Sequence, residues 1–152
     1  MTPLDWTPAH VPQPRLLQGH HVRLEPLDPP RHGEDLWEAL HDRDPALWDY
    51  LPYGPFTERA AFDSWLAGLA QGRDPLFYAV VDPRDGRALG QLSLMSIVPE
   101  HGSIEIGHVA FGGRLQRTPL GHFQLFLKGL NGDALIVSRR HVAGVRKMMQ
   151  QL

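Results

Sequence analysis

The chain has 152 residues, of which 42% are hydrophobic, 21% are charged and none is cysteine. This length suits one domain around a single core, and the lack of cysteine excludes disulfides, thiolate metal sites and a cysteine nucleophile. The net charge of −2 is uneven, because residues 128–152 carry five basic residues against one acidic residue. The acidic remainder argues against a nucleic-acid surface. No apolar run reaches the ~18 residues that a membrane span needs, and we expect a cytoplasmic protein.

The first part of the chain is rich in proline. Four prolines within residues 1–14 predict an extended arm, which Trp6 pins to the body. Residues 21–27 alternate between apolar and polar side chains and predict a first strand, which we expect Asp28-Pro29-Pro30 to end. Apolar residues at helical spacing then predict a short helix over residues 34–41.

The middle of the chain carries the clearest patterns. Residues 46–56 are aromatic and interrupted by prolines, which predicts an irregular segment. Thr57 is placed to cap a helix that stops near Gly72. Turn-forming residues then separate three predicted strands, which we expect to form an antiparallel meander: residues 76–81, 88–98 and 103–111.

The composition changes after this meander. Residues 112–119 predict a polar loop, and helical spacing resumes at Leu120. A short strand over residues 134–137 and a basic helix after Ser138 complete the predicted elements. All 14 prolines lie at or before Pro119, whereas both lysines lie beyond residue 127.

Four segments follow one another in a specific order: QGHHVRLEPL at 18–27, WDYLPYGPF at 48–56, IEIGHV at 104–109 and LQRTP at 115–119. Together they resemble the GNAT N-acetyltransferase superfamily, and more narrowly its ribosomal-protein alanine acetyltransferase-like (RimJ/RimL-like) branch. The resemblance implies an α+β fold with a mixed, mostly antiparallel sheet flanked by helices. It also implies an enzyme that passes an acetyl group from acetyl-CoA to a primary amine, on a protein N-terminus or a small molecule, by direct attack.

The resemblance covers residues 15–119, so we expect an extended arm over residues 1–14, a GNAT-like core over 15–119 and a divergent helical segment over 120–152. The family's later strands and helix have no counterpart in residues 120–152, which suggests a divergent, truncated or frame-shifted ending. A sheet edge left uncovered by such an ending favours self-association into a homo-oligomer. A catalytically silent relic that binds acyl-CoA weakly, or serves as an interaction module, is therefore the alternative function.

In the resembling family, the strand matching residues 103–111 parts from its neighbour at a bulge and pairs with the pantetheine arm of the cofactor. Gly107 suits such a bulge, although it equally suits close packing of a neighbouring ring. Residues 113–121 resemble the pyrophosphate site, where free N–H groups and arginines attract negative charge, and a plain solvated loop is the alternative. The cofactor-binding residues implied are Gly107, Val109, Phe111, Arg114, Gln116, Arg117, Thr118 and Gly121.

Glu105 is the candidate general base that the resemblance implies, taking a proton from the acceptor ammonium through water. An ordinary carboxylate, with a pKa near ~4.3, is a weak base for an ammonium, so burial or a water chain must help. Strict alternation puts Glu105 on the same face as Gly107 and Val109, and a solvated glutamate is the alternative. Alternation puts His108 on the other face as a core histidine, unless a bulge re-aims it.

The aromatic segment is the candidate site for the acceptor amine, because rings hold a cation by burial and by cation–π attraction. The same rings equally suit a plug that fixes a loop onto the sheet. The substrate-binding residues implied are Trp48, Tyr50, Tyr53 and Phe56. The nine histidines show no spacing typical of metal ligands, so we expect no metal.

Overall fold

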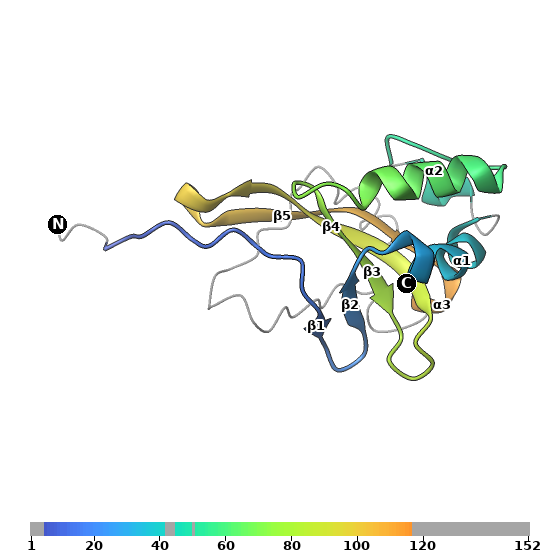
Figure 1. Cartoon of the computed structure of the whole chain (residues 1–152), viewed down its shortest axis with the longest axis horizontal. Helices are drawn as coiled ribbons and strands as arrows, with labels where there is room; N and C mark the ends of the chain where they lie inside the picture. Colours follow the sequence, from blue (N-terminus) through green and yellow to red (C-terminus); the bar gives the residue numbers. More distant parts are fainter. Residues whose placement is uncertain (1–4, 42–44, 50, 117–152) are drawn as a thin grey trace.

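The computed structural model describes residues 5–41, 45–49 and 51–116 (Figure 1). Within these residues, five antiparallel strands form one sheet in chain order, namely β1 (Leu17–Gln18), β2 (Arg23–Pro26), β3 (Leu76–Val81), β4 (Ala88–Val98) and β5 (Ser103–Phe111). The helices are α1 (Pro29–Leu40), α2 (Arg59–Leu69) and the short α3 (Gly113–Gln116). Two 3₁₀ turns cover Pro45–Leu47 and Pro99–His101. The predicted α+β class is confirmed.

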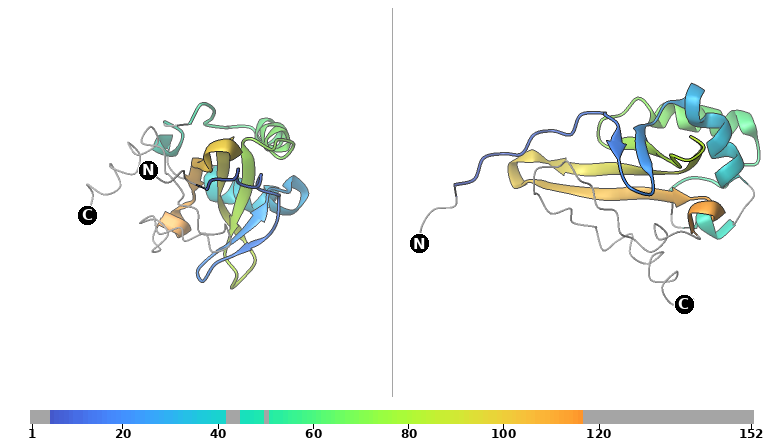
Figure 2. Two further views of the ribbon diagram at one scale, coloured as in Figure 1. Left: turned by 90° about the vertical axis from the view of Figure 1, so that its left-hand side faces the viewer. Right: turned by 90° about the horizontal axis from the view of Figure 1, so that it is seen from below.

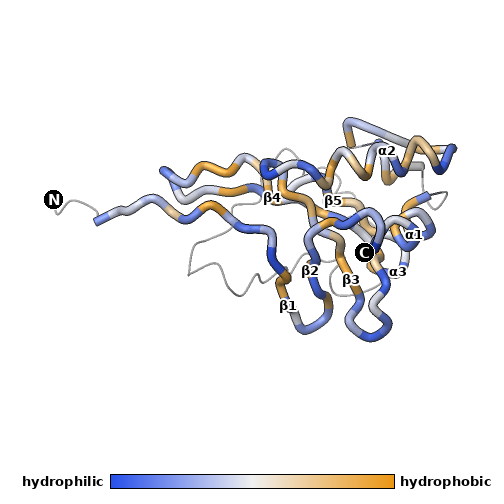
Figure 3. The backbone as a smooth tube through the Cα atoms, in the orientation of Figure 1, coloured by the Kyte–Doolittle hydropathy of each residue, from blue (hydrophilic) through white to orange (hydrophobic). Residues whose placement is uncertain are grey.

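The three central strands have the predicted bounds. β3 is a run of six apolar residues, and all six are buried, because both faces of the sheet are covered at this strand. Its turn to β4 contains polar residues and Gly86, whose φ of 74° suits glycine. Figure 3 shows this contrast between hydrophobic strands and a hydrophilic turn. β3, β4 and β5 pair antiparallel in sequence, which confirms the predicted meander.

The first helix is longer than predicted. Pro29 and Pro30 occupy its first turn instead of ending the preceding strand, because a proline at this position gives up an N–H that has no partner within the helix. The backbone N–H groups of Arg31 and His32 both donate to the Asp28 carbonyl. The expected start at residue 34 was therefore wrong by more than one turn.

Three other boundaries differ from the predictions. The first strand is reduced to β2, because only Arg23–Pro26 pair with β3. The α2 helix begins after Glu58, without a side-chain cap bond, so the predicted Thr57 cap was wrong. Residues 113–116 form α3 inside the predicted polar loop.

Hydrophobic side chains pack on both faces of the sheet. On one face, α1 and α2 cover β3 and the start of β4 (Figure 1), with a core of Leu27, Leu36, Leu40, Trp48, Phe62, Leu66, Phe77, Ala79, Val81, Ala88 and Ala110. We call this the helix-covered face. The opposite face has its own core of Val22, Leu24, Leu76, Tyr78, Val80, Leu89, Leu92, Leu94, Ile106, Phe111 and Leu115.

The N-terminal arm runs beside the long hairpin of β4 and β5 (Figure 2). The indole Nε1 of Trp6 donates to the Glu100 carbonyl at 2.8 Å, and the Ala9 N–H donates to the Pro99 carbonyl at 2.9 Å. Gly102 has a φ of 59°, and a Cβ atom there would lie 2.5 Å from the Trp6 ring. The prediction that Trp6 pins the arm is confirmed.

The elements predicted after residue 119 lie outside the described residues. Within the described part, no helix has the length and apolar character that a membrane crossing requires.

Candidate active site

The pairing of β4 with β5 contains a bulge. Gln91 pairs with Ala110 and Ser93 pairs with Gly107, so His108 and Val109 together oppose the single residue Leu92. His108 takes up the extra residue with a φ of 50°, which is uncommon for a residue other than glycine. The bulge expected at Gly107 therefore lies at the next two residues.

After Gly107, the bulge reverses which face of the sheet each β5 side chain lies on. The His108 ring contacts Phe77 and Tyr53 on the helix-covered face, whereas Val109 packs with the core of the opposite face. Strict alternation therefore placed both residues wrongly, because an extra residue shifts the side-chain period by one. The expectation that a bulge would turn the His108 side chain to the other face is confirmed.

His108 is held between two rings. Its Nδ1 lies 2.9 Å from the Tyr53 hydroxyl, and the two rings stack with planes 11° apart and centroids 5.7 Å apart. The Phe77 ring lies 5.2 Å from the imidazole, centroid to centroid. Burial raises the pKa of the Tyr53 phenol, so this hydroxyl stays protonated at neutral pH.

Glu105 lies on the same face as this pair. It is half-buried and opposes Met95, while Gly107 opposes Ser93, whose hydroxyl donates to the Gly107 carbonyl at 3.2 Å. Residues that oppose each other in a sheet share a face. A Cβ atom at Gly107 would lie 2.2 Å from the Met95 sulfur, so the close neighbour here is a flexible thioether instead of the expected ring.

The aromatic segment meets α2 on the helix-covered face. Trp48 is buried, 5% exposed, and its ring lies 5.8 Å from that of Trp65, centroid to centroid. Tyr53 and Phe56 are half-buried, and each ring centroid lies 4.8 Å from that of Trp65. Trp48 fits the plug alternative, whereas Tyr53 reaches the bulge of β5. Tyr50 lies outside the described residues.

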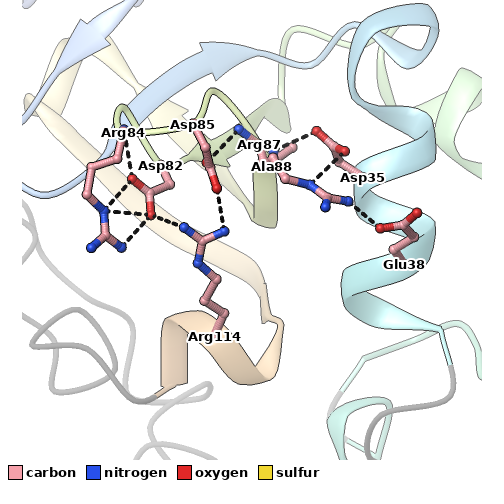
Figure 4. Close-up of polar contacts among 8 residues, drawn as sticks. All are labelled: Asp35, Glu38, Asp82, Arg84, Asp85, Arg87, Ala88 and Arg114. Carbon is pink, nitrogen blue, oxygen red and sulfur yellow. Dashed lines mark hydrogen bonds and ion pairs between the residues drawn. The ribbon is translucent and has the colours of Figure 1, made fainter.

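Arg114 of α3 pairs with the turn between β3 and β4 (Figure 4). The Arg114 guanidinium donates to Asp82 at 2.8 Å and to Asp85 at 2.6 Å. Hydrogen bonds from Arg84 lower the pKa of Asp82 to about 2, against the effect of burial. Arg114 is thus paired with two carboxylates, and its predicted contact with a pyrophosphate stays a prediction.

The other predicted cofactor residues divide into two groups. Phe111 is buried in the core of the face opposite the helices. Arg117, Thr118 and Gly121 lie outside the described residues, as does the side chain of Gln116.

The pairing of Tyr53 with His108 was not foreseen from the sequence. The available signal was the dipeptide Gly107-His108 in the middle of a strand, because a strand glycine often marks a bulge and a bulge re-aims the next side chain. The partner hydroxyl comes from 55 residues away, and no local pattern identifies it. Over the residues that the structure covers, no cluster of three or more His, Asp or Glu side chains has the arrangement of a metal site.

This architecture is the fold of the GNAT acetyltransferases. Among solved structures, a GCN5-related N-acetyltransferase from Brucella melitensis superposes with a TM-score of 0.75 and 36% identity, covering 81% of this chain and 56% of its own. An acetyltransferase of the GNAT family from Chromobacterium violaceum superposes with a TM-score of 0.71 and 40% identity, covering 84% of this chain and 65% of its own. The chain thus spans less than two thirds of either neighbour.

A more distant neighbour supports the fold alone. A ribosomal-protein-serine acetyltransferase from Vibrio cholerae superposes with a TM-score of 0.53 at 10% identity, over 71% of this chain and 60% of its own. No protein-family model matches the chain. A stretch of 39 residues, 26% of the chain, is 85% identical to the positive alginate biosynthesis regulatory protein of Pseudomonas aeruginosa and covers 16% of that protein.

Proposed function

We propose that the chain is a cytoplasmic N-acetyltransferase that uses acetyl-CoA to acetylate a primary amine by direct attack. The acceptor is a protein N-terminus or a small amine, as in the ribosomal-protein alanine acetyltransferase-like branch that the sequence resembles. The observation that carries the proposal is the bulge at His108 and Val109, on the strand that the resemblance assigns to the thioester carrier. Acetyltransferase neighbours at 36% and 40% identity add independent support.

The residues at this bulge fit the proposed cofactor. A bulge interrupts the regular ladder between β4 and β5, and it leaves backbone groups of β5 able to pair with an extended pantetheine chain. When bound, acetyl-CoA supplies an activated acetyl group. Gly107, Val109 and Phe111 would hold the pantetheine arm, and residues 113–121 would hold the pyrophosphate.

The acceptor amine would enter from the helix-covered face. Tyr53 and Phe56 are half-buried there and offer aromatic surface to an ammonium. Glu105 lies on the same face and would take the first proton from that ammonium through a water molecule. Loss of this proton frees the nitrogen lone pair for attack.

Acetyl transfer is tested by supplying the full chain with acetyl-CoA and a panel of amines, including peptides with free N-termini, and measuring amide product by mass spectrometry. We expect product with at least one amine, and about a 100-fold lower kcat for Glu105→Gln. Glu100→Gln is the matched control, because Glu100 is exposed at the tip of the hairpin. A Glu105→Gln variant with wild-type turnover would remove Glu105 as the base.

Cofactor binding is tested separately by calorimetry with acetyl-CoA. We expect saturable binding that Arg117→Ala and Thr118→Glu weaken, because the first removes positive charge and the second adds negative charge near the diphosphate. Absence of binding at millimolar acetyl-CoA would contradict the proposed function. Binding without transfer to any amine would instead favour the silent relic.

A further inference from the structure

An ammonium loses two protons when it becomes a secondary amide, and Glu105 accounts for one of them. We propose that Tyr53 and His108 form a proton relay for the second: the Tyr53 hydroxyl takes a proton from the acceptor nitrogen and passes its own proton to His108 Nδ1. This inference rests on the proposed function and adds two residues to it.

The geometry of the pair suits proton transfer. The distance of 2.9 Å between the Tyr53 hydroxyl and His108 Nδ1 is that of a direct hydrogen bond. Stacking of the Tyr53 ring on one side and contact with the Phe77 ring fix the orientation of the imidazole. The left-handed backbone of His108 keeps its side chain on the helix-covered face, where alternation alone would not place it.

The relay requires the Tyr53 hydroxyl to donate to His108 Nδ1. Burial raises the pKa of the Tyr53 phenol, so the hydroxyl carries a proton at neutral pH and is able to donate it. Imidazole accepts protons near neutral pH, and a neutral ring that accepts at Nδ1 carries its own proton on Nε2. In this arrangement the pair is neutral before the reaction, and His108 Nδ1 is the position that receives the proton.

The relay lies within reach of the proposed base. Glu105 precedes His108 by three residues on β5 and shares its face, which separates the two by roughly 10 Å along the strand at ~3.3 Å per residue. An amine bound between them would reach the carboxylate through a water molecule on one side and contact the Tyr53 hydroxyl on the other. Tyr53 is half-buried and belongs to the aromatic segment proposed to bind the acceptor.

The C–N bond of the amide forms as the C–S bond of the thioester breaks, and the departing sulfur keeps the electron pair of that bond. The protons balance as well. The N–H bond of the acceptor breaks and leaves its electron pair on nitrogen, while a new O–H bond forms on Tyr53. The original O–H bond of Tyr53 breaks as an N–H bond forms at His108 Nδ1, and the imidazole becomes an imidazolium. The imidazolium then returns the proton to water through the same hydroxyl.

The hydrogen-bond direction is tested without any reaction, by ¹⁵N NMR of the His108 ring in the full chain at neutral pH. We expect Nδ1 to be unprotonated and Nε2 to carry the proton, and Tyr53→Phe to change the Nδ1 shift. Tyr78→Phe is the matched control, because it removes a hydroxyl from the opposite face of the sheet. A proton on Nδ1 in the wild-type chain would overturn the relay.

The kinetic test compares Tyr53→Phe and His108→Asn. Asparagine tolerates a positive φ and its Oδ1 still accepts from the Tyr53 hydroxyl, but it does not take up a proton. We expect kcat to fall about 100-fold in each variant, with the KM for acetyl-CoA unchanged. Tyr78→Phe and His101→Asn, an exposed position, should keep the wild-type kcat.

The outcomes separate the relay from the proposed function. If the wild-type chain transfers acetyl and both Tyr53→Phe and His108→Asn keep its kcat, the relay is wrong and the proposed function stands. If the wild-type chain transfers acetyl to no amine, both are wrong. If His108→Asn does not fold, Tyr53→Phe still decides, because it removes one partly buried hydroxyl and leaves the ring in place.

Discussion

Two polar clusters lie on the helix-covered face of the sheet. One is centred on a carboxylate, and the other joins two aromatic rings. At β2 and α1, the Glu25 carboxylate accepts hydrogen bonds from Arg23 at 2.8 Å, from Arg31 at 2.6 Å and from His32 at 3.0 Å. Burial by itself raises the pKa of Glu25, but these three partners outweigh it and lower the pKa to about 2. At β5, in contrast, the contact joins two rings, the Tyr53 phenol and the His108 imidazole.

The difference separates a structural cluster from a reactive one. His32 Nδ1 accepts from the Asp28 N–H at 3.0 Å, so its proton is on Nε2, where it serves Glu25. Three side chains donate to the Glu25 carboxylate, so replacing that carboxylate removes the negative charge that Arg23 and Arg31 pair with. At β5, the proposed relay instead moves a proton between Tyr53 and His108.

The largest effect is expected where the backbone positions Tyr53. Gly54 has a φ of 76°, and a Cβ atom there would lie 2.4 Å from the Trp48 ring. We expect Gly54→Ala to cost about 3 kcal/mol of unfolding free energy, from backbone strain and overpacking together. Urea unfolding measures this cost.

The Gly86→Ala variant separates the cost of backbone strain from the cost of overpacking. Gly86 has nearly the same φ, 74°, but no atom within 4 Å of a Cβ position. We expect it to cost about 1 kcal/mol, from backbone strain alone. Equal costs for the two alanine variants would show that Trp48 does not fix this segment.

The next effect is at the structural cluster. Glu25→Gln leaves the charges of Arg23 and Arg31 without a counter-ion, and we expect a loss of about 2 kcal/mol in urea unfolding, since both arginines keep some solvent contact. Glu34→Gln is the matched control, because Glu34 pairs with Arg59 at the surface and should change stability by less than about 0.5 kcal/mol. A Glu25→Gln variant as stable as Glu34→Gln would contradict a structural role for the cluster.

The same cluster predicts how stability depends on pH. The pKa of Glu25 is about 2 in the folded chain, which is below its ordinary value, so its stabilisation is present above the ordinary value and is lost as the pH falls toward 2. The low pKa of Asp82 acts in the same window. We expect the unfolding free energy to fall between pH 4.5 and 2, less steeply in Glu25→Gln than in the wild type. Parallel pH profiles would contradict this assignment.

The smallest effect is expected at Arg114. Its side chain is 43% exposed, and Arg84 still pairs with Asp82 when Arg114 is removed, so Arg114→Ala should cost less than about 1 kcal/mol. If Arg114 exchanges its carboxylates for a diphosphate, Arg114→Ala weakens acetyl-CoA binding more than Arg84→Ala does. Equal affinities in calorimetry would assign Arg114 to the turn alone.

The sequence predicted elements well where one pattern dominated. β3, β4 and β5 had the expected bounds, because long apolar runs lie between turn-forming residues. The start of α1 was missed because Pro29 and Pro30 are compatible both with the end of a strand and with the first turn of a helix. β1 was missed because two residues are too few to show a periodicity.

The candidate site was predictable only in part. Glu105 and Gly107 share a face as alternation indicates, because the strand is regular between them. His108 and Val109 exchanged faces, because one extra residue enters β5 after Gly107 and alternation carries no information on where a bulge lies. The contact of His108 with Tyr53 depends on packing between the aromatic segment and β5, which no spacing in the chain encodes.

The central claim is that the bulged strand β5 supports transfer of an acetyl group to an amine. The most direct measurement is mass spectrometry of a free-amine peptide panel after incubation with acetyl-CoA and the full chain, beside Glu105→Gln. The account predicts an acetylated peptide whose rate of formation falls sharply in the variant. Unmodified peptides throughout, from a folded wild-type chain, would contradict it.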